Sequence, residues 1–334
     1  MSKKNISICV AIIIATTAAF YCIHKKKDQP SNELPLIAIA NYGPHPTLDA
    51  SIRGLKEHLS AHGYIENKTV RYEISDVGFD QALIPQMISK LRDMKPLVIV
   101  VKSTPVAQFA KGKIHDIPLV YCDITDPVEV GLIKDKSQPH ENITGSSDQE
   151  DLEPLLAFAK RLLPHAKTIG ILYSTSDAND AALVRMMHAA AEKAGLRVIA
   201  VPVDQSRDIP VRMQKFNGNV DFIYVGTSGP IQPALPVIAA EAHKMRIPVF
   251  NAGDQAVHEG LALASFGVNY DAVGKNAGRL VEQLLKGASI KDLPPTYPAP
   301  EDHQCVVNEN VAKALNVAVP SDVTTCKSSV NNLK

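Results

Sequence analysis

Hydroxyl side chains stand at three points where an apolar, β-rich run gives way to the start of a helical segment. A helix start offers unpaired backbone N–H groups and a favourable dipole to an anion. These side chains either contact a ligand or serve as ordinary helix caps, and the threefold repetition leaves the two interpretations about equally supported. At the first point, Thr104 is the expected cap and Pro105 the first helical residue. The candidates for ligand contact are Ser103, Thr104, Tyr173, Ser174, Asp177, Thr227 and Ser228.

Two further turns carry groups that could contact a ligand. Tyr42 and His45 lie in a proline-stiffened turn, where the ring could stack on a ligand and the imidazole could hydrogen-bond to one. The alternative is a rigid turn that Thr47 caps. Asp126 follows another apolar run, and its carboxylate either holds a ligand ammonium group or makes an Asx-type turn. Tyr42, His45 and Asp126 therefore join the candidate ligand-binding residues.

The sequence lacks the short motifs of common enzymes. It contains no Gly-x-Ser-x-Gly elbow, no Gly-x-x-x-x-Gly-Lys phosphate loop, no His-Glu-x-x-His and no Gly-x-Gly-x-x-Gly. His58 and His62 are the one histidine pair at a helical spacing of four, and we interpret them as exposed residues near a helix end. We therefore expect no catalytic residue, no metal and no cofactor, although a Ser-His-Asp triad assembled from distant positions remains an alternative.

The composition argues against several classes of partner and compartment. The 334 residues carry 35 Lys and Arg against 35 Asp and Glu, and the formal net charge of +0 offers no basic surplus for DNA or RNA. There is no Trp to stack on bases or sugar rings. The five cysteines contain no Cys-x-x-Cys pair, and Cys305 and Cys326 are either bridged to each other or free. We expect no nucleic-acid partner.

The N-terminus has the features of an export segment. Residues 6–23 carry no charge, follow Lys3 and Lys4, and are short for a membrane-spanning helix of ~20 residues. Cleavage, lipidation at Cys22 and retention as a membrane anchor stay open, because Phe20 and Tyr21 are bulky where cleavage or lipidation favours small residues. In all three cases residues 1–33 are a signal peptide or anchor plus tether, and the rest of the chain lies in the periplasm or otherwise outside the cytoplasm.

The elements that must position these residues alternate between strand and helix in two series. Apolar runs followed by helical periodicity predict two lobes, each a doubly wound α/β layer built on a parallel sheet. Ligands bind beyond the carboxyl ends of such strands, so two facing lobes form a cleft. We expect one lobe from 34–145 with 254–290, a second from 146–253 with 291–322, and a tail at 323–334.

Several short motifs of this sequence, taken together, match a known family. In combination, they resemble the ABC-transporter substrate-binding proteins of the tryptophan/tyrosine-type group, which have the type I periplasmic binding protein fold. The resemblance implies two lobes joined by a multi-crossing hinge that close on a small ligand, often an amino acid, for delivery to a membrane permease and its ATPase. It rests on His45-Pro46, Thr104-Pro105, Thr125-Asp126-Pro127-Val128, Asn142-Ile143-Thr144-Gly145, Ile169-Gly170-Ile171-Leu172-Tyr173 and Asn269-Tyr270.

Two positions depart from that family. Ser228-Gly229 stands where the family usually has Asp-Asn, which puts an α-amino-acid ligand in doubt and fits a ligand without an ammonium group. Asp177, Asp126 or Asp254 could instead supply the missing carboxylate. The alternatives to an importer's binding protein are a membrane-tethered ligand-sensing module of the same fold and, more weakly, an exported hydrolase. A cytoplasmic repressor is disfavoured, because an export segment stands where a DNA-binding domain would have to be.

Overall fold

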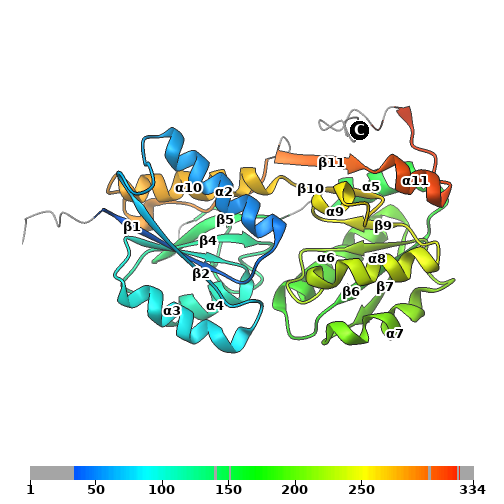
Figure 1. The fold of residues 1–334 in the computed structure, drawn as a ribbon, viewed down its shortest axis with the longest axis horizontal. Helices are drawn as coiled ribbons and strands as arrows, with labels where there is room; N and C mark the ends of the chain where they lie inside the picture. The colour runs from blue at the N-terminus through cyan, green and yellow to red at the C-terminus, as the bar shows by residue number, and fades with distance from the viewer. Residues whose placement is uncertain (1–33, 139–140, 150–151, 300–301, 322, 324–334) are drawn as a thin grey trace, which may run out of the picture. The chain divides into compact units, whose positions relative to one another are not determined.

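The structure is a computed structural model that describes residues 34–138, 141–149, 152–299, 302–321 and 323. The helices and strands of the described residues belong to the unit that begins at Pro35, and they form two α/β lobes (Figure 1). The expected signal peptide or anchor, 1–33, and most of the expected tail lie outside the described residues. Within the described part of the chain, no helix combines the length and the apolar character that crossing a membrane would require.

The first lobe is built on a sheet of five parallel strands in the order β2-β1-β3-β4-β5. Side chains alternate along β1, so that Ile37 and Ile39 pack under α2 and α10, whereas Ala38 and Ala40 face α3 and α4. The elements are β1 (Leu36–Asn41), α2 (Pro46–Ala61), β2 (Arg71–Asp76), α3 (Ile84–Asp93), β3 (Val98–Lys102), α4 (Thr104–Lys113), β4 (Leu119–Ile124), β5 (Ile143–Ser147) and α10 (Tyr270–Leu285).

The second lobe is built on a sheet of six strands in the order β11-β10-β9-β8-β6-β7, in which β11 is antiparallel and the others are parallel. Its core lies on both faces, with α5 and α6 on one and α7 and α8 on the other. The elements are α5 (Leu152–Leu162), β6 (Thr168–Tyr173), α6 (Ala178–Ala194), β7 (Arg197–Pro202), α7 (Ile209–Met213), β8 (Phe222–Val225), α8 (Leu235–Lys244), β9 (Val249–Asn251), α9 (Gln255–His258), β10 (Ala264–Val268), β11 (His303–Val307) and α11 (Glu309–Leu315).

Among the described elements, the chain changes lobe after β5, between β10 and α10, and between Thr296 and β11. These passages differ from the expected boundaries. Residue 254 was the expected return to the first lobe, but β10 pairs with β9 and extends the second sheet. Conversely, Leu293 packs in the first core and Thr296 bridges to Ser146, although 291–322 was assigned to the second lobe. Strand pairing decides these boundaries, and residue spacing alone does not reveal it.

The structure describes one cysteine of the expected pair and the first residue of the expected tail. Cys305 in β11 is disulfide-bonded, and Cys122 at the end of β4 is a buried free thiol. Cys326, the expected partner of Cys305, lies outside the described residues. Val323, at the start of the expected tail, is buried in the core of the second lobe. The second lobe therefore extends at least one residue beyond the expected boundary.

Candidate functional site

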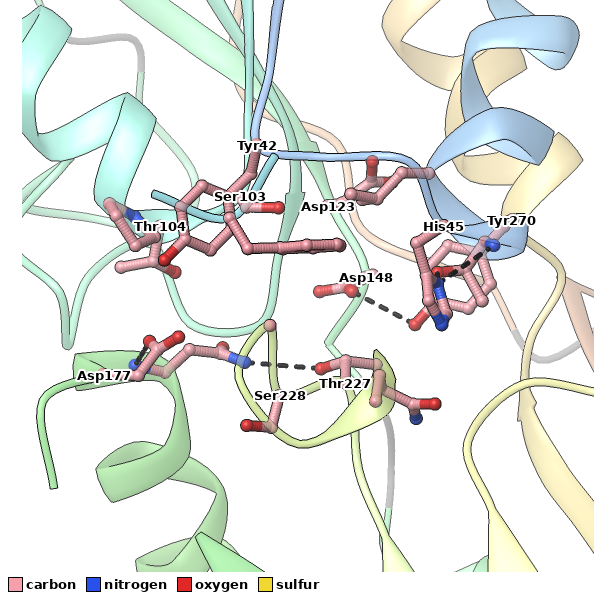
Figure 2. A pocket seen from close by; sticks show the side chains of 17 residues that line it. Tyr42, His45, Ser103, Thr104, Asp123, Asp148, Asp177, Thr227, Ser228 and Tyr270 are labelled. Atoms are coloured by element: carbon pink, nitrogen blue, oxygen red, sulfur yellow. Dashed lines mark hydrogen bonds between the residues drawn. The ribbon is translucent and has the colours of Figure 1, made fainter. Parts of the chain in front are cut away.

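A cavity lies where the carboxyl ends of strands from both lobes meet, and Figure 2 shows the side chains around it. β1, β3 and β4 bring residues of the first lobe to it, while β6 and β8 bring residues of the second. This is the position at which open α/β sheets bind ligands. The lining residues are Tyr42, His45, Thr47, Leu48, Phe79, Ser103, Thr104, Pro105, Asp123, Asp148, Asp177, Asn179, Thr227, Ser228, Gly229, Gln232 and Tyr270.

The structure brings seven of the eleven candidate residues together at this cavity. Tyr42, His45, Ser103 and Thr104 come from the first lobe, and Asp177, Thr227 and Ser228 come from the second. The helix caps differ from those expected. His45, not Thr47, caps α2, because its Nδ1 accepts a hydrogen bond from Thr47 N. α4 begins at Thr104, one residue earlier than expected, after Ser103 with a left-handed φ of 70°.

The other four candidates do not line the cavity. Asp126 makes the turn considered as its alternative role, since its Oδ1 accepts the backbone N–H groups of residues 128 and 129. Ser174 lies behind the cavity, where its N–H donates to Asp180, and Tyr173 is the last residue of β6. Asp254 accepts a hydrogen bond from Gln304. Asp126 and Asp254, two of the residues expected to supply a ligand-binding carboxylate, therefore do not line this cavity.

Several lining residues were missed in the sequence. Asp148 and Tyr270 flank two of the passages between the lobes, so their approach depends on chain crossings that spacing does not reveal. Asn179 follows the cap of α6, and Gln232 begins a 3₁₀ turn after β8. Phe79 lies in the turn after β2 with a left-handed φ of 67°, a conformation that is uncommon for an aromatic residue. An aromatic residue directly after Gly78, in a turn that follows a strand, is the sequence feature that could have identified Phe79 as a lining residue.

An aromatic wall closes one side of the cavity. The rings of Tyr42 and Phe79 meet edge to face, with centroids 5.4 Å apart. Tyr42 also packs on Gly229 of the second lobe, where a Cβ would lie 2.6 Å from the tyrosine ring. A glycine therefore suits position 229, because the tyrosine ring occupies the space that an asparagine would need.

A buried ion pair supports the first-lobe side of the cavity. Lys102, at the end of β3, donates to Asp123 Oδ2 over 2.5 Å, and Ser51 of α2 donates to the same oxygen over 2.8 Å. Lys102 is 1% exposed. Asp123, the second-last residue of β4, has a left-handed φ of 59°, as has Ser103 directly after β3 (70°), so unusual backbone conformations occur at the ends of both strands.

Asp148 is a buried carboxyl group at the base of the cavity (Figure 2). Its Oδ2 accepts a hydrogen bond from the Tyr270 hydroxyl over 3.3 Å, and its Oδ1 has no hydrogen-bond partner among the described residues. Burial, and then the nearby charge of Asp123, raise the pKa of Asp148 to about 7. The group therefore changes charge near neutral pH.

Two adjacent carboxyl groups lie on the second-lobe side. Asp177 caps α6, and Asp180 accepts hydrogen bonds from Ser174 N and Ser228 Oγ, each over 2.6 Å. Burial raises the pKa of Asp177, and burial together with the charge of Asp177 raises the pKa of Asp180 to about 7. Within the described residues, no lysine, arginine or histidine pairs with either carboxyl group. The Ser228 hydroxyl thus donates to a buried carboxylate on the same wall.

Comparison with known proteins gives consistent results. The chain is 30% identical over 324 residues to the tyrosine-binding protein of Clostridioides difficile (strain R20291), covering 95% of this chain and 93% of that protein. A crystal structure of an ABC domain in complex with L-Trp from Streptococcus pneumoniae has a TM-score of 0.82 at 28% identity, over 88% of this chain and 98% of that one. The ligand-free, open structure of a substrate-binding protein with adhesive properties from Clostridium difficile has a TM-score of 0.68 at 30% identity, over 86% and 97%.

The fold and family predicted from the sequence are confirmed by these findings. A glucose-galactose binding protein from Geobacillus stearothermophilus, at 14% identity and a TM-score of 0.57, shares the fold alone. The relatives at higher identity are solute-binding proteins and not enzymes. Residues 36–331 match the family model described as ABC transporter substrate binding protein. This chain therefore belongs to the ABC transporter substrate-binding protein family.

Proposed function

We propose that this protein is the extracytoplasmic binding protein of an ABC importer and that it captures a small molecule bearing an ammonium group, with an aromatic amino acid as the first candidate. One observation carries the proposal: the cavity between the lobes holds more buried hydrogen-bond acceptors and carboxylates than its own residues can satisfy. An unsatisfied buried polar atom costs about 1–3 kcal/mol, which a complementary ligand removes.

The ammonium group is inferred from the acceptors. Asp148 Oδ1 and Asn179 Oδ1 line the cavity and have no donor among the described residues. Lys102 is already paired with Asp123. An ammonium group has three donors and one positive charge, and hydrogen bonds between charged groups are about twice as strong as neutral ones. A ligand amine therefore suits this side of the cavity, although position 228 carries no carboxylate.

The rest of an amino acid has matching surfaces. The N-terminus of α4, beside Ser103 and Thr104, favours a carboxylate, and the buried Thr104 hydroxyl has no partner among the described residues. Tyr42 and Phe79 offer aromatic surface for a side chain. The tyrosine-binding relative and the tryptophan-bound relative support an aromatic amino acid.

Closure of the lobes would complete the site. The chain has a TM-score of 0.82 to the tryptophan-bound structure and 0.68 to the open, ligand-free one, which supports a closed arrangement with Tyr42 against Gly229. A ligand that contacts both lobes only in this arrangement shifts the population towards it. Delivery to a permease and its ATPase, and attachment to the membrane through 1–33, belong to the same proposal.

The test is thermal unfolding and calorimetry of the full chain with L-tyrosine, L-tryptophan, tyramine and N-acetyl-L-tyrosine. An amino acid at a hundred times its Kd should add ~2.7 kcal/mol to the free energy of unfolding, whereas the N-acetyl form, which has lost the ammonium group, should add almost none. Asp148→Asn should weaken binding by about 10- to 100-fold, as expected for a hydrogen bond to a charged group. Asp254→Asn, outside the cavity, is the matched control.

Equal binding of L-tyrosine and its N-acetyl form would contradict recognition of an ammonium group. Equal affinity of the two aspartate variants would contradict the role of Asp148. Small-angle scattering that shows the same radius of gyration with and without a bound ligand would contradict closure. Unchanged uptake of that ligand by cells from which the chain is deleted would contradict the importer.

A further inference from the structure

Helices α2 and α10 pack side by side over the first sheet, although more than 200 residues separate them in the chain (Figure 1). Glycines permit the close approach. A Cβ on Gly274 would lie 2.0 Å from the carbonyl oxygen of Ser51, and one on Gly54 would lie 2.1 Å from that of Asp271. The approach brings His58 of α2 within hydrogen-bonding distance of Glu282 of α10.

His58, His62 and Glu282 form a cluster of potential metal ligands at this contact. One ligand atom from each residue lies within 4.8 Å of the others. His58 Nε2 and Glu282 Oε2 are 2.7 Å apart, and both side chains are about nine-tenths buried. The two imidazole rings are stacked, with centroids 4.2 Å apart, because His62 caps the C-terminus of α2 four residues after His58. Small side-chain adjustments would direct all three ligand atoms to one point.

The hydrogen bonds around the cluster orient two of its members for a metal. His62 Nδ1 donates to the backbone oxygen of His58 over 2.7 Å, and since a carbonyl only accepts, the lone pair of His62 is on Nε2. Lys286 Nζ donates to Glu282 Oε1 over 2.5 Å, and the other carboxylate oxygen, Oε2, is the one that contacts His58. Outer contacts of this kind fix the ring tautomer and the carboxylate orientation in metal sites.

We propose that His58 Nε2, His62 Nε2 and Glu282 Oε2 form a binding site for a divalent transition metal ion of the zinc class. Two imidazoles and one carboxylate suit Zn²⁺, and three protein ligands leave a coordination position for water. The metal replaces the hydrogen bond between His58 and Glu282, and the His58 proton moves to Nδ1. His58 is 12 residues from Pro46 at the cleft end of α2, about 18 Å along the helix, so this site is separate from the solute cleft.

The function of such an ion would be to join α2 to α10 within the first lobe. α10 directly follows one of the passages between the lobes, and its contacts with α2 are the most extensive between any two elements. Because a metal that binds only the folded state stabilises it, Zn²⁺ should raise the midpoint of thermal unfolding of the full chain.

The test uses Co²⁺ as a spectroscopic probe for Zn²⁺, with the full chain purified without a polyhistidine tag. We expect Co²⁺ to produce visible absorption bands that Zn²⁺ abolishes by competition. His62→Ala should weaken Co²⁺ binding at least tenfold and leave the metal-free unfolding midpoint almost unchanged, because His62 is exposed. His62→Cys should restore binding with an added thiolate charge-transfer band. His243→Ala, another exposed helical histidine, is the matched control and should bind as the unmodified protein does.

Three results would overturn the site: no Co²⁺ bands with the unmodified chain, equal affinity of His62→Ala and the unmodified chain, or equal weakening in the His62→Ala and His243→Ala variants. Metal ligands elsewhere in the chain are common to both variants, so they cannot produce a difference between them. Glu282→Gln tests the third ligand, and metal binding unaffected by this change would reduce the site to the two histidines and overturn the assignment.

Discussion

Asp123 on the first-lobe wall of the solute cleft has a different kind of partner from Asp177 and Asp180 on the second-lobe wall. On the first-lobe wall, Asp123 is paired with the buried ammonium group of Lys102. On the second-lobe wall, Asp177 and Asp180 lie side by side, and only hydroxyl and backbone N–H groups donate to them among the described residues. Lys102 neutralises Asp123 when the first lobe folds. Asp177 and Asp180 on the second wall, like Asp148 after β5, have no cationic partner among the described residues and can take up protons or a positively charged ligand.

The same difference separates structural from functional use of a carboxylate. The ion pair of Lys102 and Asp123 joins β3, β4 and α2, so its loss should act first on stability. Asp177 and Asp180 have no positively charged partner among the described residues, so changes there should alter the pH dependence of stability and the affinity for a ligand. Variants on the first wall should therefore change stability, and variants on the second wall should change its pH dependence and the affinity for a ligand.

The largest effect is expected from Lys102→Met. It leaves Asp123 as a buried charge without its partner, which typically costs 3–5 kcal/mol, and urea unfolding measures the loss. Lys102→Met with Asp123→Asn should recover most of it, since asparagine tolerates the left-handed backbone at 123. Lys90→Met, in an exposed pair with Glu73, is the control and should cost at most ~1 kcal/mol. Equal losses in the Lys102 and Lys90 variants would show that the buried pair has no special structural role.

A smaller effect is expected from Ser228→Ala on the opposite wall. The Ser228 hydroxyl donates to Asp180, and loss of a hydrogen bond to a charged group costs about 1.5–3 kcal/mol. The cost should be highest at pH 8, where Asp180 is ionised, and lower at pH 5, where it is protonated. Ser206→Ala, on an exposed turn, should be nearly neutral at both pH values. A loss that does not depend on pH would indicate that Ser228 contributes packing alone.

The contrast between the walls also shows what the sequence could reveal. Alternating apolar runs predicted both sheets, and hydroxyl residues at strand ends predicted contributions from both lobes, because strand ends of a parallel sheet share one edge. Thr104, Thr227 and Ser228 were proposed in this way, and all three line the cavity. Such residues belong to local patterns, and local patterns are what a sequence displays directly.

The remaining features depend on pairings between distant segments. Asp148 and Tyr270 meet only because two passages between the lobes run side by side, and no local pattern encodes that contact. The assignment of β10 to the second sheet has the same origin. Glu282 likewise approaches His58 across 224 residues, so the histidine pair alone gave no reason to expect a third ligand.

The third prediction concerns how the free energy of unfolding of the ligand-free protein depends on pH. Burial raises the pKa values of Asp148 and Asp180 to about 7, from 3.8 in the unfolded chain. Between these values the folded state holds protons on these two groups that the unfolded state has lost, so their contribution to stability is fully present below pH ~4 and falls as the pH rises to ~7. Each group contributes at most about 1.4 kcal/mol per pH unit.

Asp180→Asn should remove one of these two contributions, while keeping an oxygen that accepts from Ser228. The variant should therefore lose less stability than the unmodified protein between pH 4 and pH 7, as measured by urea unfolding at several pH values. Asp254→Asn, at a partly exposed position outside the cleft, is the control. An ammonium ligand favours the ionised carboxylates, so its affinity should rise over the same pH range while protons are released on binding. If the slope is the same in the Asp180 and Asp254 variants, the second wall holds no titrating charge for a ligand to neutralise.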